Sequence, residues 1–332
     1  MATLKDVATR AGVSVSTVSL VMNGRDAGRV KPAIGERVRR AAAELGYAPN
    51  LLARSLRTRQ TNTIGLLSDM VASTAFAGRM LKGAQEAAWE QGCLLLLIDT
   101  GGNAEMEQSA VRALVQRNVD ALIYASMYHR EIELPEIPEG LPLIVLDGRP
   151  VEGDVDWVVP DERGGARAAV EHLRAAGHTR VGFCTVDEDI PAAHQRLEAY
   201  RDTLGGHFEP SLVMRGTTGD AHSGQWAARE LLSRPDRPTA LFCYNDRVAM
   251  GAYRAARHLG LAVPGEVSIV GFDDQEHIAD SLEPGLTTVA LPHYEMGAWA
   301  ASRLLSRAEG DATEHKLMPC PLVVRDSVAV PR

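Results

Sequence analysis

Short apolar runs alternate with amphipathic helical patterns over most of this chain, and this alternation constrains the fold more than any other feature. The runs have the length of strands and lie at residues 64–67, 94–98, 121–124, 143–146, 181–184, 240–243 and 267–270. The helical patterns lie at residues 76–90, 105–116, 163–176, 192–204, 224–232 and 246–259. Such apolar runs are typical of parallel strands buried on both faces. We therefore expect an α/β body with doubly wound parallel sheets, divided into two lobes.

Acidic and amide side chains follow the predicted strands. They are Asp69, Asp99, Asp147, Asp187, Asn245, Asp246, Asp273 and Asp274. Ligands of open α/β sheets bind at the carboxyl ends of strands, so two facing lobes would line a cleft with these groups and with Arg196. Paired donors and acceptors suit a polyhydroxylated ligand. Asp and Asn also cap helices, so both helix capping and ligand contact stay open for Asp99 and Asp187. Asp273 precedes no obvious helix start, and we therefore predict that it contacts the ligand.

The first 46 residues predict three short helices. Thr3 can cap the first helix, with Asp6 in the position of a capping box, and Gly12 ends it. Ser14 caps a second helix that ends at Asn23-Gly24. A third helix begins near Pro32 and stops at Gly46. Three short helices around a small core, joined by a tight glycine turn, predict a helix-turn-helix module whose second helix reads base edges in DNA.

Charge is distributed unevenly along the chain. Residues 1–60 hold eleven Lys or Arg against four acids, a net charge of +7, which leaves −15 for the remainder of a chain whose net charge is −8. A basic head on an acidic body favours a polyanionic partner for the head. The charge pattern therefore supports DNA, rather than an ordinary small helical bundle, as the explanation of the head.

A short apolar and basic segment, residues 50–57, follows the head. Asn50 can cap a helix there, but seven residues are too few for an isolated helix, which needs about 12–15 to be even marginally stable. We infer that this segment becomes helical only against DNA and against its copy in a second subunit. Leu52 and Leu56 lie four residues apart, and apolar side chains of this kind can wedge between base steps in the minor groove. A plain linker is the alternative interpretation.

The sequence holds no recognisable catalytic or metal-binding pattern. It lacks a dinucleotide-binding glycine motif, a P-loop and a nucleophile elbow, so we expect neither an enzyme nor a bound cofactor. The four cysteines, Cys93, Cys184, Cys243 and Cys320, are widely spaced and predict buried thiols rather than zinc ligands or disulfides. The histidines are scattered, and His178 is interpreted, with His172, His222 and His258, as a surface or helix-end residue.

Export and membrane insertion are not expected. No apolar run approaches the ~20 residues of a membrane span, and the N-terminus lacks the apolar stretch of a signal peptide. The sequence therefore predicts a cytoplasmic protein.

Several motifs resemble one family closely. They are Thr-Leu-Lys-Asp-Val-Ala-Thr-Arg-Ala-Gly-Val-Ser-Val-Ser-Thr-Val-Ser (3–19), Glu-Leu-Gly-Tyr-Ala-Pro-Asn (44–50), Leu-Ala-Arg-Ser-Leu-Arg-Thr (52–58), Thr-Ile-Gly-Leu-Leu (63–67), Asn-Asp-Arg-Val-Ala-Met-Gly-Ala (245–252), Val-Pro-Gly-Glu-Val-Ser-Ile-Val-Gly-Phe-Asp-Asp (263–274) and Leu-Thr-Thr-Val (286–289). Across nearly its whole length the chain resembles the lactose-repressor (LacI/GalR) family of bacterial transcription regulators. The resemblance implies a homodimer on a near-palindromic double-stranded operator, and a body shaped like periplasmic sugar-binding proteins.

The resemblance also implies site residues. It places base contacts at Val15, Ser16 and Leu20, and it makes Leu56 the minor-groove wedge. The full set of DNA-binding candidates is Thr3, Ser14, Val15, Ser16, Thr17, Leu20, Asn23, Asn50, Ala53, Leu56 and Arg57. The effector-binding candidates are Phe76, Asp147, Arg196, Asn245 and Asp273, with Tyr128 and Trp157 as substitutes for an aromatic residue that the family usually has near residue 219.

This chain departs from the family at positions that affect specificity. The family usually has Arg at position 20, which can pair with guanine, whereas Leu20 offers only an apolar contact, for example to a thymine methyl group. The loop 24–31 is also about two residues longer than usual. We therefore expect an operator that differs from the family's commonest sequence. The C-terminus has no leucine heptad tail, which predicts a dimer rather than a tetramer.

These observations predict a transcriptional repressor whose operator affinity is controlled by a small effector, a sugar, bound between two lobes. The expected domains are a helix-turn-helix domain at 1–49, a hinge at 50–62, and an effector-binding and dimerisation domain at 63–332, whose lobes are 63–160 with 291–320 and 161–290 with 321–332. The alternatives are a periplasmic-type sugar-binding protein, a sugar-processing enzyme and a purine-responsive, corepressed regulator.

Overall fold

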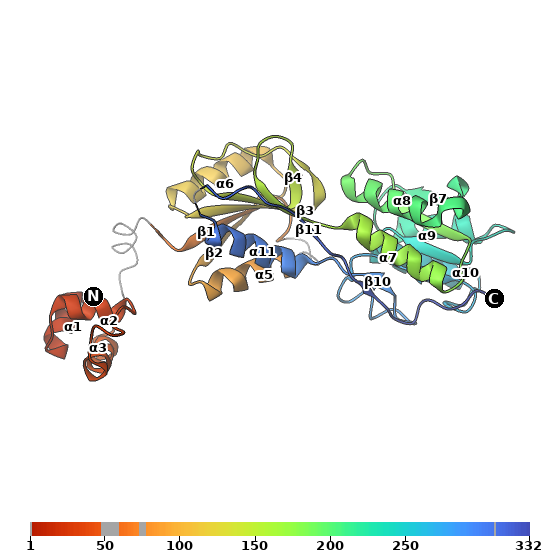
Figure 1. Ribbon diagram of the computed structural model, residues 1–332. Coiled ribbons are helices and arrows are strands. Elements are labelled where there is room, and N and C mark those ends of the chain that lie inside the picture. Colours follow the sequence, from red (N-terminus) through yellow and green to blue (C-terminus); the bar gives the residue numbers. More distant parts are fainter. Residues whose placement is uncertain (1, 48–59, 73–77, 309) are drawn as a thin grey trace. The chain divides into compact units, whose positions relative to one another are not determined.

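The head is a bundle of three helices around a small apolar core. The computed structural model describes residues 2–47, 60–72, 78–308 and 310–332, and the chain divides into two compact units, Met1–Thr61 and Asn62–Arg332. Helices α1 (Leu4–Ala11), α2 (Val15–Met22) and α3 (Pro32–Glu44) form the first unit (Figure 1). Their shared core consists of Val7, Ala8, Ala11, Val18, Val21, Val38, Ala41 and Ala42. The predicted helix at 50–57 lies outside the described residues.

The helix ends of the head are those expected from the sequence. Thr3 accepts a hydrogen bond from the backbone of Asp6, whose side chain accepts one from the Thr3 backbone at 2.8 Å, so the capping box is complete. Gly12 ends α1 with a φ of 62°, a left-handed conformation that glycine adopts without strain. Ser14 then caps α2. The tight turn between α1 and α2 therefore follows from local sequence.

The first lobe of the body is a six-stranded parallel sheet. Its strand order is β11-β5-β4-β3-β1-β2. Helices α5 (Gly78–Glu90) and α11 (His293–Ser306) cover one face, and α6 (Ala104–Gln116) covers the other (Figure 1). The strands are β1 (Thr63–Ser68), β2 (Leu94–Asp99), β3 (Ala121–Ile132), β4 (Leu143–Pro150), β5 (Asp156–Pro160) and β11 (His315–Met318).

Helices α5 and α11 approach each other closely because glycines lie at their crossing. A Cβ atom at Gly83 would lie 2.0 Å from the carbonyl oxygen of Tyr294, and one at Gly297 would lie 2.0 Å from the carbonyl oxygen of Met80. Neither position has room for a side chain. The C-terminal helix α11 is thus fixed against the N-terminal part of the body.

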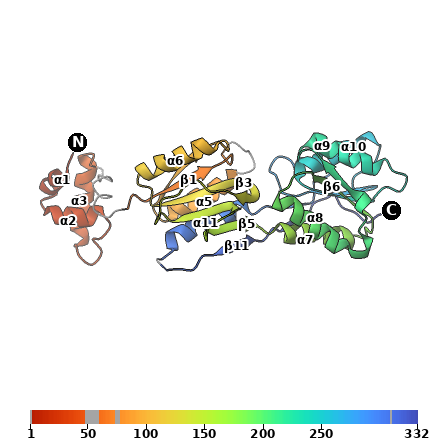
Figure 2. The same cartoon turned by 90° about the horizontal axis from the view of Figure 1, so that it is seen from above.

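The second lobe is a four-stranded parallel sheet in the order β7-β6-β8-β9. Figure 2 shows α7 and α8 on one side of β6 and α9 and α10 on the other, which agrees with the two buried clusters of this lobe. A short antiparallel pair, β10 with β12, lies beside them. The elements are β6 (Val181–Val186), β7 (Val213–Gly216), β8 (Ala240–Cys243), β9 (Ser268–Val270), β10 (Thr288–Val289), β12 (Leu322–Val323), α7 (Glu162–Ala175), α8 (Pro191–Leu204), η1 (Gly205–His207), η2 (Pro210–Leu212), α9 (Ala221–Leu232) and α10 (Asp246–His258).

The expected fold class, a helical head with a two-lobed α/β body of parallel sheets, is confirmed. All four cysteines are free and buried, as predicted. The expectation for His178 is wrong: its side chain is buried, and its nitrogens lie at hydrogen-bonding distance from Thr239, Ser268 and the carbonyl oxygen of Ala329. None of the described helices is long and apolar enough to span a bilayer.

Candidate functional site

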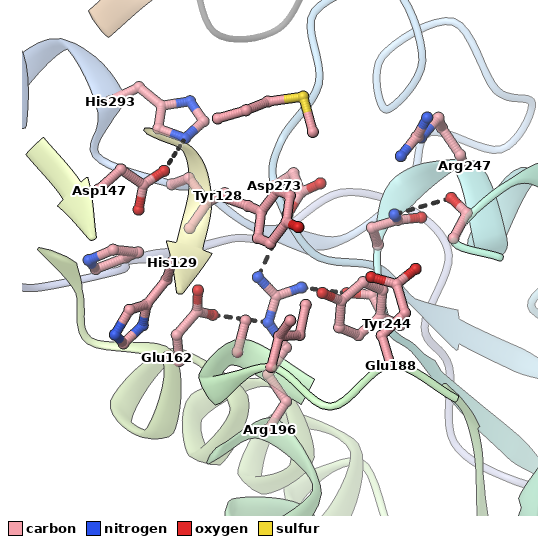
Figure 3. Close-up of a pocket in the computed structure, with 17 residues that line it drawn as sticks. Tyr128, His129, Asp147, Glu162, Glu188, Arg196, Tyr244, Arg247, Asp273 and His293 are labelled. Atoms are coloured by element: carbon pink, nitrogen blue, oxygen red, sulfur yellow. Dashed lines mark hydrogen bonds and ion pairs between the residues drawn. The ribbon is translucent and has the colours of Figure 1, made fainter. Parts of the chain in front are cut away.

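A cavity of about 150 Å³ lies between the two lobes, at the carboxyl ends of their strands (Figure 3). Five of the predicted effector residues line it, namely Tyr128, Asp147, Arg196, Asn245 and Asp273. The other lining residues are Met127, His129, Pro160, Glu162, Glu188, Ile190, Ala192, Gly219, Tyr244, Arg247, Leu291 and His293. Among the remaining predicted residues, Phe76 lies outside the described residues.

Arg196 is the centre of the second-lobe wall. This side chain is almost fully buried; its Nε donates to Glu162 Oε2 at 2.7 Å and its Nη1 donates to the carbonyl oxygen of Tyr244 at 2.5 Å. Nη2 lies 3.6 Å from Asp273 Oδ1, and the guanidinium carbon lies 3.7 Å from the centroid of the Phe272 ring. Figure 3 shows Arg196 reaching between Glu162 and Asp273. A buried guanidinium with two carboxylates is held in one orientation, ready for a ligand.

The carboxylates of the cavity sit on unusual backbone. Asp147 and Asp273 both have positive φ, at 59° and 102°, which non-glycine residues rarely adopt and which often marks functional sites. Burial raises the pKa of Asp273 to about 6, although Arg196 and the side chain of Gln275 act in the opposite direction. Asp273 follows β9 and caps no helix, so its position fits the predicted ligand contact.

Asn245 combines the two roles that the sequence leaves open for strand-end residues. Its Oδ1 accepts from the backbone N–H of Val248 and so caps α10. Its Nδ2 donates to the carbonyl oxygen of Gly219, which also lines the cavity. The amide therefore fixes the wall on the side where the family usually has an aromatic residue.

The first-lobe wall holds groups that sequence reasoning missed. His129 on β3 is 1% exposed, and burial, with Arg149 and Arg196 nearby, lowers its pKa to about 3. His293, the first residue of α11, places Nε2 3.9 Å from Asp147 Oδ2, as the dashed line in Figure 3 marks. Burial, then Glu162 and Asp69, raise the pKa of Asp147 well above its usual value. No sequence signal identifies these histidines, because β3 and α11 meet only in the fold.

Other predicted polar residues have structural partners away from the cavity. Asp69 pairs with Arg130 at 2.9 Å, and Asp99 accepts a hydrogen bond from the backbone of Gly101. Asp187 is exposed and does not line the cavity. Neither Asp99 nor Asp187 caps a helix, because the residues at those cap positions are Asn103 and Ile190.

Trp157 requires a correction. It does not line the cavity but stacks on His315, with ring centroids 4.7 Å apart, and packs against the cluster beneath α6. Trp157 is the second residue of β5 and pairs with Val145, two residues before the cavity-lining Asp147, so it lies within the sheet and not at the carboxyl end of β5, where Pro160 lines the cavity. Tyr128 remains the predicted aromatic residue that does line it.

The surface of α2 matches the expected reading face only in part. Val15 and Ser16 are exposed at the start of α2, and Leu20 is half-buried one turn later. The other candidates of the described head make local hydrogen bonds: Thr3 and Ser14 cap helices, Thr17 contacts Ser14, and Asn23 donates to the carbonyl oxygen of Ser19. Asn50, Ala53, Leu56 and Arg57 lie outside the described residues.

Comparisons with known proteins match the whole chain. Residues 3–50 match bacterial regulatory proteins of the lacI family, and residues 170–328 match the periplasmic binding protein-like domain. The chain is 34% identical to the ribose operon repressor of Haemophilus influenzae over 99% of both chains. It is 36% identical to the HTH-type transcriptional regulator GalR of Salmonella typhimurium over 100% of this chain and 97% of that one. The chain belongs to the lacI family of bacterial regulatory proteins.

Solved structures of this family share the fold over the full length. The lac repressor dimer bound to operator and the anti-inducer ONPF aligns with a TM-score of 0.78 and 27% identity, covering 99% of each chain. The transcriptional regulator CelR in complex with cellobiose aligns with a TM-score of 0.66 and 31% identity, covering 98% of this chain and all of that one. This lacI-family chain is therefore a transcriptional regulator with a DNA-binding helix-turn-helix head and an effector-binding body.

Proposed function

We propose that this lacI-family protein is a repressor whose operator affinity is set by a monosaccharide in the cavity between its lobes. The observation that carries the proposal is the lining of that cavity, where Arg196, Asp273, Asn245 and Asp147 converge. Its volume of about 150 Å³ is that of a cavity that holds one small organic molecule. A monosaccharide has that size and the paired hydroxyl groups that such side chains bind.

We propose for this chain the domains that its sequence predicts. Residues 1–49 would bind DNA, residues 50–62 would form the hinge, and residues 63–332 would bind the effector and dimerise, with lobes at 63–160 with 291–320 and at 161–290 with 321–332. Val15, Ser16 and Leu20 would contact bases in the major groove, since they lie on one helix of the helix-turn-helix. Leu56 would enter the minor groove.

A homodimer on a near-palindromic operator fits the body as well as the head. Strand β2 lies at the edge of its sheet, and Leu94 and Leu97 on it are 53% and 38% exposed. Trp89, at the end of neighbouring α5, is 67% exposed. An apolar sheet edge of this kind is stable when a second copy covers it. The lac repressor that shares the fold is a dimer bound to operator. Because its partner is DNA, we place the protein in the cytoplasm.

The test is an operator-binding titration with and without sugar. Fluorescence anisotropy of a labelled operator, selected from random sequence by the purified protein, would be measured at fixed salt with each monosaccharide in turn. A regulator that moves from mostly bound to mostly released needs roughly 3–5 kcal/mol of differential effector affinity. If no monosaccharide changes operator affinity, the proposal is wrong.

Leu56→Ala tests the hinge separately. We expect weaker binding to the selected operator and a smaller change on unrelated DNA, because a minor-groove wedge acts only where the duplex can be kinked. Sugar binding to the same variant, followed by the thermal midpoint, is the control. Equal operator affinity in the variant and the wild type would contradict the wedge role.

A purine effector is the second candidate, because the sequence leaves a purine-responsive regulator open. The HTH-type transcriptional repressor PurR of Vibrio vulnificus is 32% identical over 99% of both chains. The aromatic residue that the family usually has near residue 219 is missing from this chain, so a base would lack that stacking partner. Hypoxanthine and guanine therefore belong in the titration, and we expect them to have no effect.

A further inference from the structure

The two most buried histidines of the body differ in their hydrogen-bond partners. His178 is 2% exposed and both ring nitrogens lie within 3.0 Å of hydrogen-bonding groups. His129 is 1% exposed, yet within the described part of the chain neither of its ring nitrogens has a hydrogen-bond partner. Buried polar groups in proteins are nearly always hydrogen-bonded, and each exception calls for an explanation such as a bound ligand.

A second unpartnered group lies on the neighbouring strand. Asp147 on β4 is 2% exposed, and among the residues described its Oδ1 also lacks a partner. Both side chains line the same cavity. The pairing of β3 with β4 is irregular between Ala125 and Arg130, just where His129 lies. Such irregularities re-aim side chains next to functional sites. The strand irregularity, the unpartnered imidazole of His129 and the unpartnered Oδ1 of Asp147 therefore point to one subsite.

The chemistry of this subsite matches a hydroxyl group. Burial favours the uncharged forms of both side chains, lowering the pKa of His129 and raising that of Asp147. A neutral imidazole offers one donor and one acceptor, and a protonated carboxyl group also offers both. A hydroxyl group is the ligand function that can donate and accept in return. The two side chains together can bind a pair of hydroxyl groups.

The charges that line the cavity disfavour an anionic ligand. Besides Asp147, whose uncharged form is favoured by burial, three carboxyl groups line the cavity, from Glu162, Glu188 and Asp273, against the two arginines Arg196 and Arg247. Arg196 is already engaged by Glu162, Asp273 and the carbonyl oxygen of Tyr244. Arg247 is likewise engaged, and its charge acts on Asp273. A phosphate or carboxylate on the ligand would therefore meet an excess of acidic groups.

We propose that His129 and Asp147 form a hydroxyl-binding subsite that makes the pocket select an uncharged polyol over its phosphorylated or oxidised counterpart, with His129 as the specificity-determining residue. The inference rests on the proposed function, since it concerns the effector of the same cavity. It adds a chemical class and a residue that contacts the ligand, on the wall opposite Arg196.

The first experiment measures how the charge of the ligand affects its binding affinity. Isothermal titration calorimetry with the full chain would compare the common aldopentoses and aldohexoses with their phosphate esters and uronic acids. We expect at least one uncharged sugar to bind, and its phosphate ester and uronic acid to bind at least 100-fold more weakly. A charged derivative that binds as tightly as its parent sugar overturns the proposal, and so does a panel in which no uncharged sugar binds.

Operator anisotropy with the same compounds distinguishes failure of the subsite proposal from failure of the proposed function. If a sugar phosphate changes operator affinity while its parent sugar does not, the regulator function stands and the subsite proposal fails. If no compound changes operator affinity, the proposed function itself fails.

The second experiment tests His129 directly. His129→Leu should weaken the sugar that binds best by about 10- to 100-fold, the loss expected for one or two hydrogen bonds. His129→Gln, which keeps a donor and an acceptor, should recover part of that affinity. His207→Leu, the same change at an exposed histidine of η1, is the matched control and should bind like the wild type.

Two further readouts exclude a merely structural role for His129. The thermal midpoint of His129→Leu should be no lower than that of the wild type, because an unpartnered buried polar group is replaced by an apolar one. Deoxy analogues should identify one hydroxyl whose removal weakens binding to the wild type but not to His129→Leu. Unchanged affinity in His129→Leu, or equal losses for every deoxy analogue in both proteins, would refute the subsite.

Discussion

Replacing Arg196 by methionine tests how the second-lobe wall is held together. The change removes the charge that compensates two buried carboxyl groups, since the side chains of Glu162 and Asp273 are 2% and 10% exposed. Breaking a buried ion pair from one side costs about 3–5 kcal/mol, because a buried charge stays uncompensated. In a domain of this size 1 kcal/mol shifts the thermal midpoint by about 2–4 °C, so we expect a loss of about 6–20 °C.

The side chain of Asp273 decides how the stability lost in Arg196→Met changes with pH. Its pKa in the folded protein, about 6, lies above its ordinary value of 3.8, so folding disfavours its ionised form. This group therefore favours the folded state most at low pH, and its effect is lost as the pH rises through about 6. Removing Arg196 removes a charge that opposes the shift, and the pKa of Asp273 should rise further. The stability lost by Arg196→Met should thus be larger at pH 8 than at pH 5.

Circular dichroism melts at both pH values would measure these differences. The matched control is Arg163→Met, since Arg163 pairs with Glu198 at 3.0 Å and Asp202 at 2.6 Å but is 45% exposed. Exposed pairs of this kind contribute at most about 1 kcal/mol. Adding Glu162→Gln to Arg196→Met should recover part of the lost stability. Equal losses in the two single variants, or a loss by Arg196→Met that does not grow with pH, would refute the reasoning.

Three further substitutions, the first with Gly78→Ala as its control, test the packing and the head. Gly297→Ala would place a methyl group 2.0 Å from the carbonyl oxygen of Met80 and should cost about 1–3 kcal/mol in urea unfolding, whereas Gly78→Ala, with nothing within 4 Å, should not destabilise. Leu20→Arg should shift operator preference toward guanine by about 1–3 kcal/mol in competition assays, because arginine pairs with that base. Thr3→Ala should lower the stability of the head by about 0.5–2 kcal/mol, seen in its amide exchange.

The head was predictable because its signals are local. Thr3, Gly12 and Ser14 act on backbone within four residues of themselves, so their spacing alone sets where α1 ends and α2 begins. The same holds for the alternation of strands and helices in the body. The short strands β5 and β7 were missed, because a charged residue, Asp156 in β5 and Arg215 in β7, interrupts the apolar pattern of each.

Five effector residues in one cavity were predicted from the family resemblance and from the tendency of ligands to bind at the carboxyl ends of parallel strands. Neither argument predicts that Trp157 lies outside that cavity. Whether a strand residue reaches this cavity depends on how far along the sheet the strand register places it, and Trp157 lies beside Val145, before the strand ends that border the cavity. The register of β5 against β4 and β11 is a property of the assembled sheet. Local sequence around Trp157 does not contain it.

The order of capped helices and buried strands, and with it the family, was determined by sequence alone, because each of these features is encoded within about a dozen consecutive residues. The wall made by His129, Asp147 and His293 was decided only by the tertiary structure. These residues come from β3, β4 and the start of α11, and α11 reaches them only after the chain has passed through the second lobe. Burial of an unpartnered imidazole arises from that convergence, and no pattern of neighbouring residues specifies it.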